Sequence, residues 1–431
     1  MKGYIHSIIL EEGLCRGCTH CVRRCPTEAI RVMDGRARIL PVRCVDCGEC
    51  VRACPYKAHG VLFDTLTSIS DKSKTMVLVP PVFYSHFNPP VSFTVVDKFI
   101  QSLGFLGAFD LNLVFEVYPL MLSRYYEANK GNQRFIPIAC PSVPRLLSVR
   151  FPDILHNIVR LDSPWEVGAH IVKERQKGVQ VALLVSCPAQ VTAVRAPLGV
   201  ETSQVDYVIP ISHIYHLARR FFEKAPGDEL SKGLLGAGGD WLSEFLPSFT
   251  VLNAGCMDEV SEVLNEVETR HFSSADFLEF WACCNGCAGG VLNALSSHAI
   301  TFNLKSVRRK LKDTIPLNSR NEILAMFESG RYNLVREIAA RPVLMLDEDM
   351  DVSLRKMEEL EHILKTLPGI DCGACGAPTC RAFAEDVVLG WSYVTDCVFV
   401  LRDKLKKLAE EVRDLSHFGP PSARFKSKEV K

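Results

Sequence analysis

Two cysteine runs near the N-terminus share one spacing, and this repeat constrains the fold more than any other feature of the chain. CRGCTHCVRRCP begins at Cys15 and CVDCGECVRACP begins at Cys44, so both have the pattern C-x2-C-x2-C-x3-C-P and lie 29 residues apart. Thiolates at this spacing bind metal clusters, and the proline after each fourth cysteine stops the chain from continuing as helix. The repeat therefore predicts two metal clusters held by eight thiolates.

The two runs resemble those of bacterial two-cluster ferredoxins over about residues 4–65. In that pattern each [4Fe-4S] cluster takes three cysteines from one run and the fourth from the other run. The implied ligands are Cys15, Cys18, Cys21 and Cys54 for the first cluster, and Cys44, Cys47, Cys50 and Cys25 for the second. The alternative is a pair of zinc sites, which would need pairs of thiolates separated by a longer spacer.

The remaining composition is that of an ordinary globular chain of two to four domains. The 431 residues include 50 Lys+Arg, 50 Asp+Glu and 18 cysteines. A net charge near zero argues against a nucleic-acid partner, and no apolar run reaches the ~18 residues of a membrane span. The N-terminus lacks the pattern of a signal peptide. Clustered cysteines in such number favour metal binding in a reducing, cytoplasmic compartment.

The middle of the chain contains apolar runs that we expect to be strands of a mainly parallel α/β sheet with helices on both faces. The runs begin at Thr75, Leu111, Phe135, Val179, Val205 and Phe277, and they alternate with stretches of helical period such as residues 152–161 and 163–178. Three of the runs end in cysteine, at Cys140, Cys187 and Cys283. The carboxyl ends of parallel strands meet at one edge of a sheet, so these thiols are expected to converge.

Cys287 follows Cys283 by one helical turn and brings the set to four thiols, the number that a cubane needs. Gly286, Gly289 and Gly290 are expected to leave room for a bulky cluster. The alternative is that these cysteines are ordinary core residues, and we keep that interpretation for Cys256 and Cys284. GLLGAGGD, at residues 233–240, is interpreted as a flexible surface loop.

Residues 75–310 resemble the catalytic domain of [FeFe] hydrogenases, in particular its sensory branch. The resemblance is carried by IACPS at 138–142, SCPAQ at 186–190 and ACCNGCAGG at 282–290. It implies that Cys140, Cys187, Cys283 and Cys287 hold the [4Fe-4S] part of the H-cluster, with Cys287 bridging to a diiron part. Two positions depart from the family. Ala139 replaces the proton-relay cysteine of fast hydrogenases, and Gln190 replaces a lysine that supports the diiron part.

Near the C-terminus, four cysteines have the spacing C-x2-C-x4-C-x16-C: Cys372, Cys375, Cys380 and Cys397. This segment resembles the small [4Fe-4S] domain of corrinoid iron–sulfur proteins and RnfB-type electron-transport subunits, with a zinc site as the alternative. Residues 401–431 are expected to be an amphipathic helix and a disordered basic tail. The helix is expected to pack on its own domain, or to dock a partner or a second copy.

These features predict a multidomain α/β protein. Its expected parts are an α+β ferredoxin at 1–68, a parallel α/β hydrogenase-like domain at 75–315, an α-helical cluster domain at 340–400 and the helical tail at 401–431. Sixteen of the 18 cysteines would hold up to four [4Fe-4S] clusters. The leading hypothesis is a redox- or H2-responsive signalling protein with a separate redox or signalling partner. A slow [FeFe] hydrogenase and an electron-transfer subunit without a diiron site stay open as alternatives.

Overall fold

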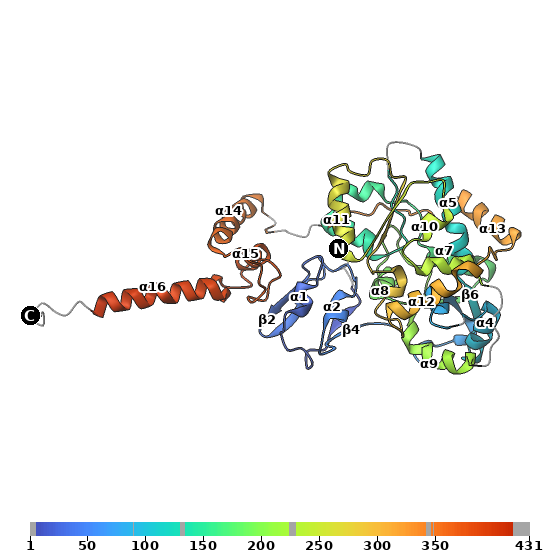
Figure 1. Ribbon diagram of the computed structural model, residues 1–431, viewed down its shortest axis with the longest axis horizontal. Helices are drawn as coiled ribbons and strands as arrows, with labels where there is room; N and C mark the ends of the chain where they lie inside the picture. The colour runs from blue at the N-terminus through green and yellow to red at the C-terminus, as the bar shows by residue number, and fades with distance from the viewer. Residues whose placement is uncertain are drawn as a thin grey trace, which may run out of the picture. The chain divides into compact units, whose positions relative to one another are not determined.

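The computed structural model describes residues 6–88, 90–129, 134–223, 230–341, 346–347 and 349–416 (Figure 1). Contacts divide these residues into two compact units. The first unit comprises residues 6–15 and 40–341, and the second comprises residues 16–39 and 346–416. The ferredoxin-like segment is therefore divided: most of the first cysteine run belongs to the second unit, and the whole second run belongs to the first unit.

The two cysteine runs repeat each other in backbone conformation. Helix α1 (His20–Arg23) and helix α2 (Glu49–Ala53) occupy equivalent places in the two runs. In each run the fourth cysteine accepts a backbone N–H at 3.2 Å, from Ala29 to Cys25 Sγ and from Ala58 to Cys54 Sγ. Left-handed residues also recur 29 positions apart, in the pairs Gly17 and Asp46, Thr19 and Gly48, and Glu28 and Lys57. Alternating left- and right-handed residues turn backbone N–H groups toward an anionic centre, as iron–sulfur sites require.

The first unit is built on parallel strands, as the sequence predicts. A four-stranded parallel sheet has the order β6-β5-β7-β8. Its strands are β5 (Thr75–Val79), β6 (Gly107–Asp110), β7 (Gln180–Val185) and β8 (Tyr207–Pro210). A second parallel pair joins β9 (Val251–Gly255) to β10 (Phe277–Trp281), and Phe135 bridges to Phe277 beside it. The short strands β1 (Ile8–Leu10) and β4 (His59–Val61) pair antiparallel.

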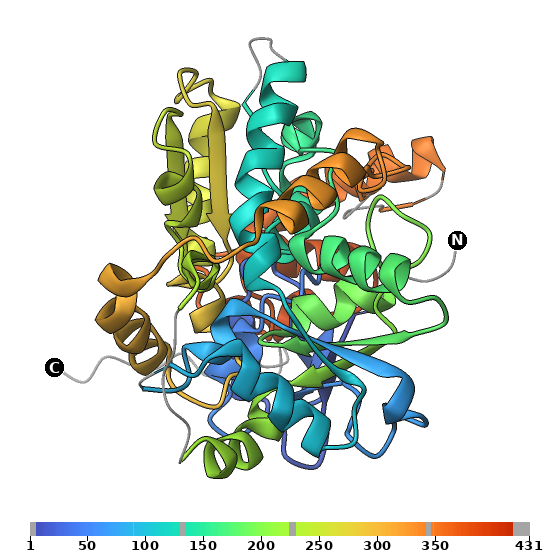
Figure 2. The same ribbon diagram turned by 90° about the vertical axis from the view of Figure 1, so that its right-hand side faces the viewer.

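Helices cover the four-stranded sheet. Helix α7 (Pro164–Arg175) contacts the central strands β5 and β7. Helices α4 (Phe93–Ser102) and α9 (Ile211–Phe222) contact each other and the edge strands β6 and β8. Figures 1 and 2 show α7 on the opposite side of the sheet from α4 and α9. Because both faces are covered, β7 is buried at five successive positions, as expected for a parallel sheet.

The other helical segments of the first unit connect these strands and pack around them. They are η1 (Lys72–Lys74), α3 (Pro81–Tyr84), α5 (Asn112–Ala128), α6 (Ser142–Arg150), η2 (Pro152–Asn157), α8 (Pro188–Arg195), η3 (Lys232–Ala237), α10 (Trp241–Phe245), α11 (Met257–Glu268), η4 (Gly286–Gly289), α12 (Ser297–Val307), η5 (Arg308–Lys310) and α13 (Leu317–Glu328). None of the described helices is both long enough and apolar enough to cross a membrane.

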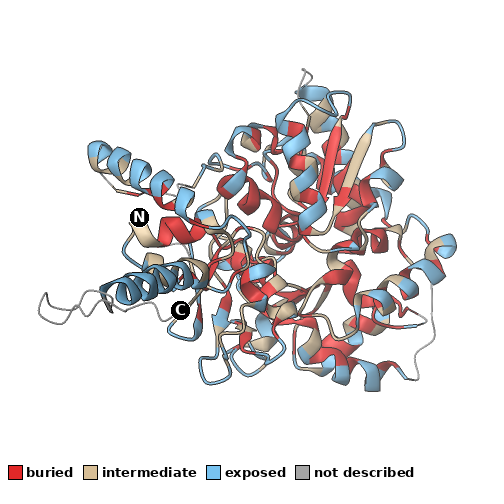
Figure 3. Ribbon diagram, turned by 60° about the vertical axis from the view of Figure 1, so that its left-hand side comes forward, coloured by how far each residue is buried: buried red, intermediate tan, exposed pale blue. Residues whose placement is uncertain are grey.

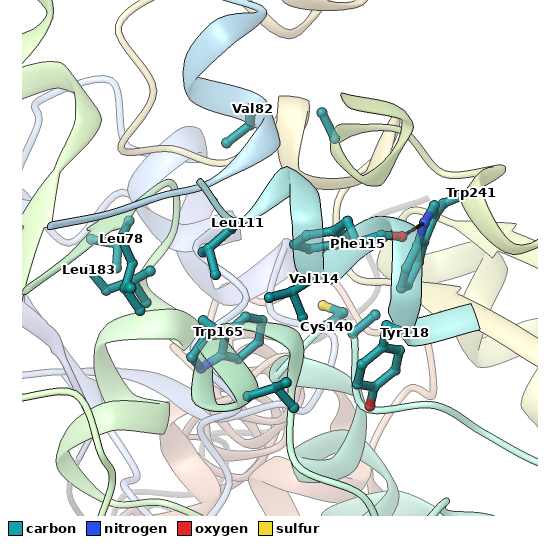
Figure 4. Packing of buried hydrophobic residues seen from close by; sticks show 14 of the residues in the cluster. Leu78, Val82, Leu111, Val114, Phe115, Tyr118, Cys140, Trp165, Leu183 and Trp241 are labelled. Carbon is teal, nitrogen blue, oxygen red and sulfur yellow. Dashed lines mark hydrogen bonds between the residues drawn. The ribbon is translucent and has the colours of Figure 1, made fainter. Parts of the chain in front are cut away.

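The core of the first unit is continuous around the predicted cluster site. Trp241 is fully buried, its ring centroid lies 5.0 Å from that of Phe115, and its Nε1 donates to the Phe115 carbonyl oxygen at 3.0 Å (Figure 4). Leu78 and Leu183 face each other across β5 and β7. Cys140 belongs to the same buried cluster. Each large side chain buried in this way stabilises the fold by about 1.5–3 kcal/mol.

The apolar run at Leu111 forms helix α5, so the prediction of a strand there is wrong. Nearly all residues from Asn112 to Leu122 are buried, including Glu116, which accepts backbone N–H groups of Thr314 and Ile315. A helix that is buried on all sides has no amphipathic period, and its apolar run cannot be told from a strand by periodicity. The strand of this βα unit is instead the preceding β6.

The loop GLLGAGGD is also buried, so its interpretation as a flexible surface loop is wrong. Residues 233–237 of η3 are buried against α5. A Cβ on Gly236 would lie 2.1 Å from the Phe115 ring, and a Cβ on Gly233 would lie 2.1 Å from the Asn112 carbonyl oxygen. The glycines are therefore needed for close packing of η3 on α5 rather than for mobility.

The second unit combines a hairpin with a small helical module. Strands β2 (Ile30–Met33) and β3 (Arg36–Ile39) pair antiparallel. Helix α14 (Met350–Thr366) packs on α15 (Cys380–Val388) around Leu360, Ile363 and Phe383. The short η6 (Val394–Asp396) leads into α16 (Val398–Ser416). The α-helical C-terminal module is as predicted.

Candidate metal-cluster sites

Four cysteines from separate elements meet in the first unit. Cys187 is the N-cap residue of α8 and follows β7 by two residues, and Cys283 follows β10 by two residues. Cys287 lies within η4, and Cys140 lies just before α6. The Cys187 thiol interacts electrostatically with the other three thiols. The structure thus brings together the four residues that the sequence predicts for the central cubane, and their role as ligands stays a prediction.

Burial is the main influence on these thiols. It raises the pKa of Cys140, and it raises the pKa of Cys187 well above the ordinary value, with the neighbouring thiols adding to the effect. It also raises the pKa of Cys283 to about 12, with Cys140 as the next contributor. Without metal these thiols are therefore neutral at neutral pH. A metal ion that binds to these thiols displaces their protons, and its positive charge offsets the negative charge of the thiolates. Four such thiolates fit an iron–sulfur cubane.

The glycines of the third cysteine loop meet other backbone segments. A Cβ on Gly290 would lie 2.2 Å from the Ser186 carbonyl oxygen. Gly286 has φ +63°, and a Cβ there would lie 2.5 Å from the Gly238 carbonyl oxygen. The contacts that demand glycine are therefore made with the protein's own chain, and not with the cluster as predicted.

The two positions that depart from the hydrogenase pattern are both buried. Ala139 precedes Cys140 and has no group that could carry a proton. Gln190 lies in the first turn of α8, where its Oε1 accepts from the backbone N and the Oγ of Ser186 at 2.8 and 3.1 Å. The Gln190 carbonyl is therefore engaged with the loop that carries Cys187.

The second cysteine run contacts the central loops within the first unit. Arg52 Nη2 donates to the Gly289 carbonyl oxygen at 2.7 Å, and the guanidinium also hydrogen-bonds the Cys283 thiol, which lowers the pKa of that thiol. Nearby, Ser7 Oγ donates to the Pro188 carbonyl oxygen at 2.8 Å. A positive charge from the second run thus lies beside one of the four central thiols.

Cys256 and Cys284 form a disulfide, so their interpretation as buried core cysteines is wrong. Cys284 is exposed and Cys256 is half-buried. The reason is the strand pairing: Cys256 directly follows β9, Cys284 closely follows β10, and the two strands pair in register up to Gly255 and Trp281. The ends of the paired strands therefore bring the two sulfurs together, on the same loop as Cys283.

The four cysteines of the C-terminal module line one pocket in the second unit. Cys372 and Cys375 lie on the loop before α15, Cys380 is its first residue, and Cys397 directly precedes α16. Asp371 Oδ1 accepts from the Cys380 backbone N at 2.6 Å and closes the loop. Burial raises the pKa of the Cys375 thiol. Four converging thiols fit a cubane, and on geometry alone they also fit zinc.

The first cysteine run holds this C-terminal loop. Arg23 Nη2 donates to the Cys372 carbonyl oxygen at 2.6 Å, and the Val32 backbone N donates to the Gly376 carbonyl oxygen at 2.8 Å. A Cβ on Gly376 would lie 2.1 Å from the Val32 carbonyl oxygen, so only glycine fits against the hairpin at this position. Because this contact joins backbone to backbone, it fixes the position of the C-terminal cysteine loop against the β2–β3 hairpin.

A buried ion pair reinforces the same contact. Arg31 Nε lies 2.5 Å from Asp386 Oδ2, and the two side chains are only 2% and 3% exposed. Arg31 Nη1 also donates to the Glu28 carbonyl oxygen at 2.7 Å. Charges buried to this extent are tolerated only when they are paired and hydrogen-bonded, so the hairpin and α15 depend on each other.

His6, Cys44 and Asp46 place potential ligand atoms within 4.8 Å of one another in the first unit. Asp46 is fully buried, and its Oδ1 accepts from the Ser7 backbone N at 3.1 Å. Cys44 is a predicted ligand of the second ferredoxin cluster. We therefore interpret His6 and Asp46 as neighbours of that predicted cluster site and not as ligands of a separate metal site. No spacing in the sequence identifies them.

Three family models match the chain at these sites. A 4Fe-4S dicluster domain matches residues 7–55, and the C-terminal domain of the iron-only hydrogenase large subunit matches residues 73–223. A putative Fe-S cluster domain matches residues 367–399. The chain is an iron–sulfur protein related to [FeFe] hydrogenases. The hydrogenase match includes Cys140 and Cys187 and ends before Cys283 and Cys287.

Two relatives match short segments of this iron–sulfur protein. An uncharacterized protein of Methanocaldococcus jannaschii is 38% identical over 60 residues, which is 14% of this chain and 27% of that protein. The B component of the ion-translocating oxidoreductase complex of Rhodobacter capsulatus is 47% identical over 53 residues, 12% of this chain and 28% of that component. The chain thus matches little more than a quarter of each relative's length. The expected likeness to RnfB-type proteins is confirmed.

Solved [FeFe]-hydrogenase structures resemble this iron–sulfur protein at low identity. The structure of HydA(deltaEFG) has a TM-score of 0.48 and 15% identity, and covers 64% of this chain and 97% of its own. A variant of HydA1 from Chlamydomonas reinhardtii has a TM-score of 0.49 and 14% identity, with the same coverages.

Sequence reasoning missed the arginines that connect these sites, although the repeat contains the signal. Both runs have the form C-V-R-x-C, which places Arg23 and Arg52 at equivalent positions 29 residues apart. Each donates to a carbonyl oxygen of a different cysteine loop. The buried pair of Arg31 and Asp386 has no comparable signal, because its partners are 355 residues apart in the chain.

Proposed function

We propose that this iron–sulfur protein passes electrons through a row of [4Fe-4S] clusters and that its central site serves a redox- or H2-responsive signal. The sixteen cysteines of the predicted ligand sets would hold four cubanes, two in the ferredoxin segment, one in the hydrogenase-like domain and one in the C-terminal module. The signal would pass to a separate redox or signalling protein.

The observation that carries this proposal is the contrast within the central site. Cys140 is buried, the other three cysteines are half-buried, and the four thiols together form a donor set that suits a cubane. The neighbouring position that would relay protons is Ala139, which cannot carry a proton. The position that would support the diiron part is Gln190, which is uncharged and whose carbonyl oxygen accepts from Ser186. A site that has the cluster ligands but no proton relay is suited to changing its redox or H2-bound state, and it is not suited to fast turnover of H2.

The contacts of the two cysteine runs support a route for the electrons. Within the first unit, the second run contacts the central thiols through Arg52. Within the second unit, the first run contacts the C-terminal cysteine loop through Arg23 and Val32. Within each unit, a cysteine run of the ferredoxin segment would then exchange electrons with the other cluster of that unit, and the C-terminal cluster would be the exit toward the partner.

Two other functions remain to be separated by experiment. A slow [FeFe] hydrogenase is favoured by the complete set of central cysteines, including Cys287 at the bridging position. A plain electron relay is favoured by Gln190, because its amide offers only neutral N–H donors where the family has a charged lysine.

Infrared spectroscopy on protein produced anaerobically with the hydrogenase maturation proteins tests the proposal. Carbonyl and cyanide bands that shift under H2, with turnover far below that of fast hydrogenases, are the expected result. High turnover would replace the proposal with a catalytic [FeFe] hydrogenase. If no such bands appear and cubanes account for all of the iron, the protein is an electron relay without a diiron site.

A further inference from the structure

Helix α16 presents a continuous apolar stripe that its own module does not use. Its exposed apolar residues are Val398 (52%), Leu401 (41%), Leu405 (56%), Leu408 (55%), Val412 (57%) and Leu415 (68%). Figure 3 shows this helix, the one that leads to the C mark, almost entirely in the colour of exposed residues. Single exposed apolar side chains are ordinary, whereas six in one line mark an interaction surface.

The helix is anchored to its module by other side chains. Phe399 and Val400 pack against the core of the C-terminal module, near Cys397. On a helix, these positions lie on the side opposite to the stripe of Val398, Leu401 and Leu405. The stripe is therefore not a misplaced core face: α16 already makes its contact with the module, and among the described residues nothing covers the stripe.

The spacing of the stripe is that of a coiled coil. Val398, Leu405 and Val412 are seven residues apart, and so are Leu401, Leu408 and Leu415. These are the a and d positions of a strict heptad repeat, with Val and Leu at a and only Leu at d. An apolar seam with a period of 3.5 residues fits a second helix with the same period better than it fits a flat surface.

The charges on α16 are divided along its length. The N-terminal half carries Arg402, Lys404, Lys406 and Lys407 against Asp403, and the C-terminal half carries Glu410, Glu411 and Asp414 against Arg413. Two such helices side by side in parallel would place like charges together. In antiparallel orientation the basic half of each helix faces the acidic half of the other, and the g positions Lys404 and Glu411 become neighbours across the seam.

We propose that α16 is a self-association surface that pairs with α16 of a second copy as an antiparallel coiled coil. A second α16 that is related to the first by a two-fold axis presents the same apolar seam and the reversed order of charges. It therefore complements the first helix, as in symmetric dimer interfaces. This would join the C-terminal modules of two chains. The inference stands independently of the function proposed above.

Sedimentation equilibrium of the full cluster-loaded chain tests the surface. We expect a monomer–dimer equilibrium, and Leu405→Lys should weaken it at least tenfold. Asp403→Lys, on the opposite side of the same helix, is the matched control and should change it little. Unchanged iron content and circular dichroism in both variants show that the fold is kept. A chain that stays monomeric, or a dimer that Leu405→Lys leaves intact, overturns the proposal.

Charge reversal tests the orientation. Lys404→Glu and Glu411→Lys should each weaken the dimer several-fold, and the double variant should restore it, because the pair is rebuilt across the antiparallel seam. A dimer that is insensitive to all three variants contradicts the antiparallel arrangement. Co-sedimentation of a monomeric chain with anionic phospholipid vesicles, lost in Leu405→Lys, would assign the stripe to a membrane surface and refute the dimer.

Discussion

Arg23 and Arg52 hold equivalent positions in the two cysteine runs, and each donates to a backbone carbonyl of a different cysteine loop. Arg23 reaches Cys372 at 2.6 Å within the second unit, and Arg52 reaches Gly289 at 2.7 Å within the first unit. The repeat that is predicted to hold the ferredoxin clusters thus also supplies one cation to each of the other predicted cluster sites. Cations and N–H donors near cluster sulfurs raise the reduction potential.

We expect Arg52→Gln to lower the reduction potential of the central cluster, because a charged donor to Cys283 is lost. A hydrogen bond to a charged group contributes about 1.5 kcal/mol, which corresponds to on the order of 60 mV for one electron. EPR-monitored redox titration measures the shift. Arg23→Gln is the matched control: it should leave the central cluster unchanged and lower the potential of the C-terminal cluster. Equal shifts of both clusters in each variant would refute the assignment.

The ion pair of Arg31 and Asp386 predicts a second effect. Removing one partner leaves a buried charge uncompensated, so Asp386→Ala should destabilise the second unit by about 3–5 kcal/mol. The matched control is Asp34→Ala in the same unit, because Asp34 and Arg38 form an exposed pair at 3.1 Å. Such surface pairs contribute about 0–1 kcal/mol. Hydrogen exchange of the α15 backbone amides measures the loss of stability in both variants. Similar protection in the two variants would contradict the stabilising role of the Arg31–Asp386 pair.

The repeat, the central cysteines and the C-terminal spacing could be recognised from sequence because each depends on short distances along the chain or on one topological rule. Cys187 and Cys283 each follow the carboxyl end of a buried parallel strand by two residues, which is the signal that could be read from the sequence. The two strands belong to separate sheets, because β7 lies in the four-stranded sheet and β10 pairs with β9, so the sheet expected from the sequence does not by itself explain why the thiols meet. The ferredoxin-like and helical modules were recognisable for the same reason, since their cysteines are closely spaced.

What could not be predicted depends on tertiary contact. The run at Leu111 is buried on all sides as α5, so its sequence has no helical period. Cys256 and Cys284 are 28 residues apart and meet only because β9 pairs with β10 in a particular register. The requirement for glycine at Gly290 comes from Ser186, whose position no local pattern specifies.

The disulfide gives a third prediction. Closing a loop of this length stabilises a fold by about 3–4 kcal/mol in the chain-entropy account, so Cys284→Ser should lower the stability of the first unit by that order. Cys256→Ser should have the same effect, and the double variant should lose no more than either. Urea unfolding of protein purified without dithiol measures this. Iron per chain should stay unchanged, and a loss of about four irons would make Cys284 a ligand.

Asp110 gives a prediction for pH. Its Oδ1 accepts from the Tyr84 hydroxyl and the Asn112 backbone N, both at 3.0 Å, and burial raises the pKa of the carboxyl from 3.8 to about 7. The folded chain therefore keeps a proton that the unfolded chain releases. The stabilisation from this group is fully present below about pH 4 and is lost as the pH rises through about 7.

Asp110→Asn cannot ionise, so its stability relative to the parent chain should rise as the pH is raised from about 4 to about 8. The upper bound is on the order of 4 kcal/mol. Thermal unfolding followed by circular dichroism at several pH values measures the difference. A difference that stays constant over this range would contradict the role assigned to Asp110.

The central claim is that Cys140, Cys187, Cys283 and Cys287 together hold one iron–sulfur cluster, and iron analysis of Cys187→Ser tests it most directly. The matched variant Cys380→Ser reports on the C-terminal module in the same way. We expect each variant to lose about four irons per chain, with the ferredoxin EPR signals retained in both. If Cys187→Ser keeps the full iron content, the central thiols are not cluster ligands and the account of this site is wrong.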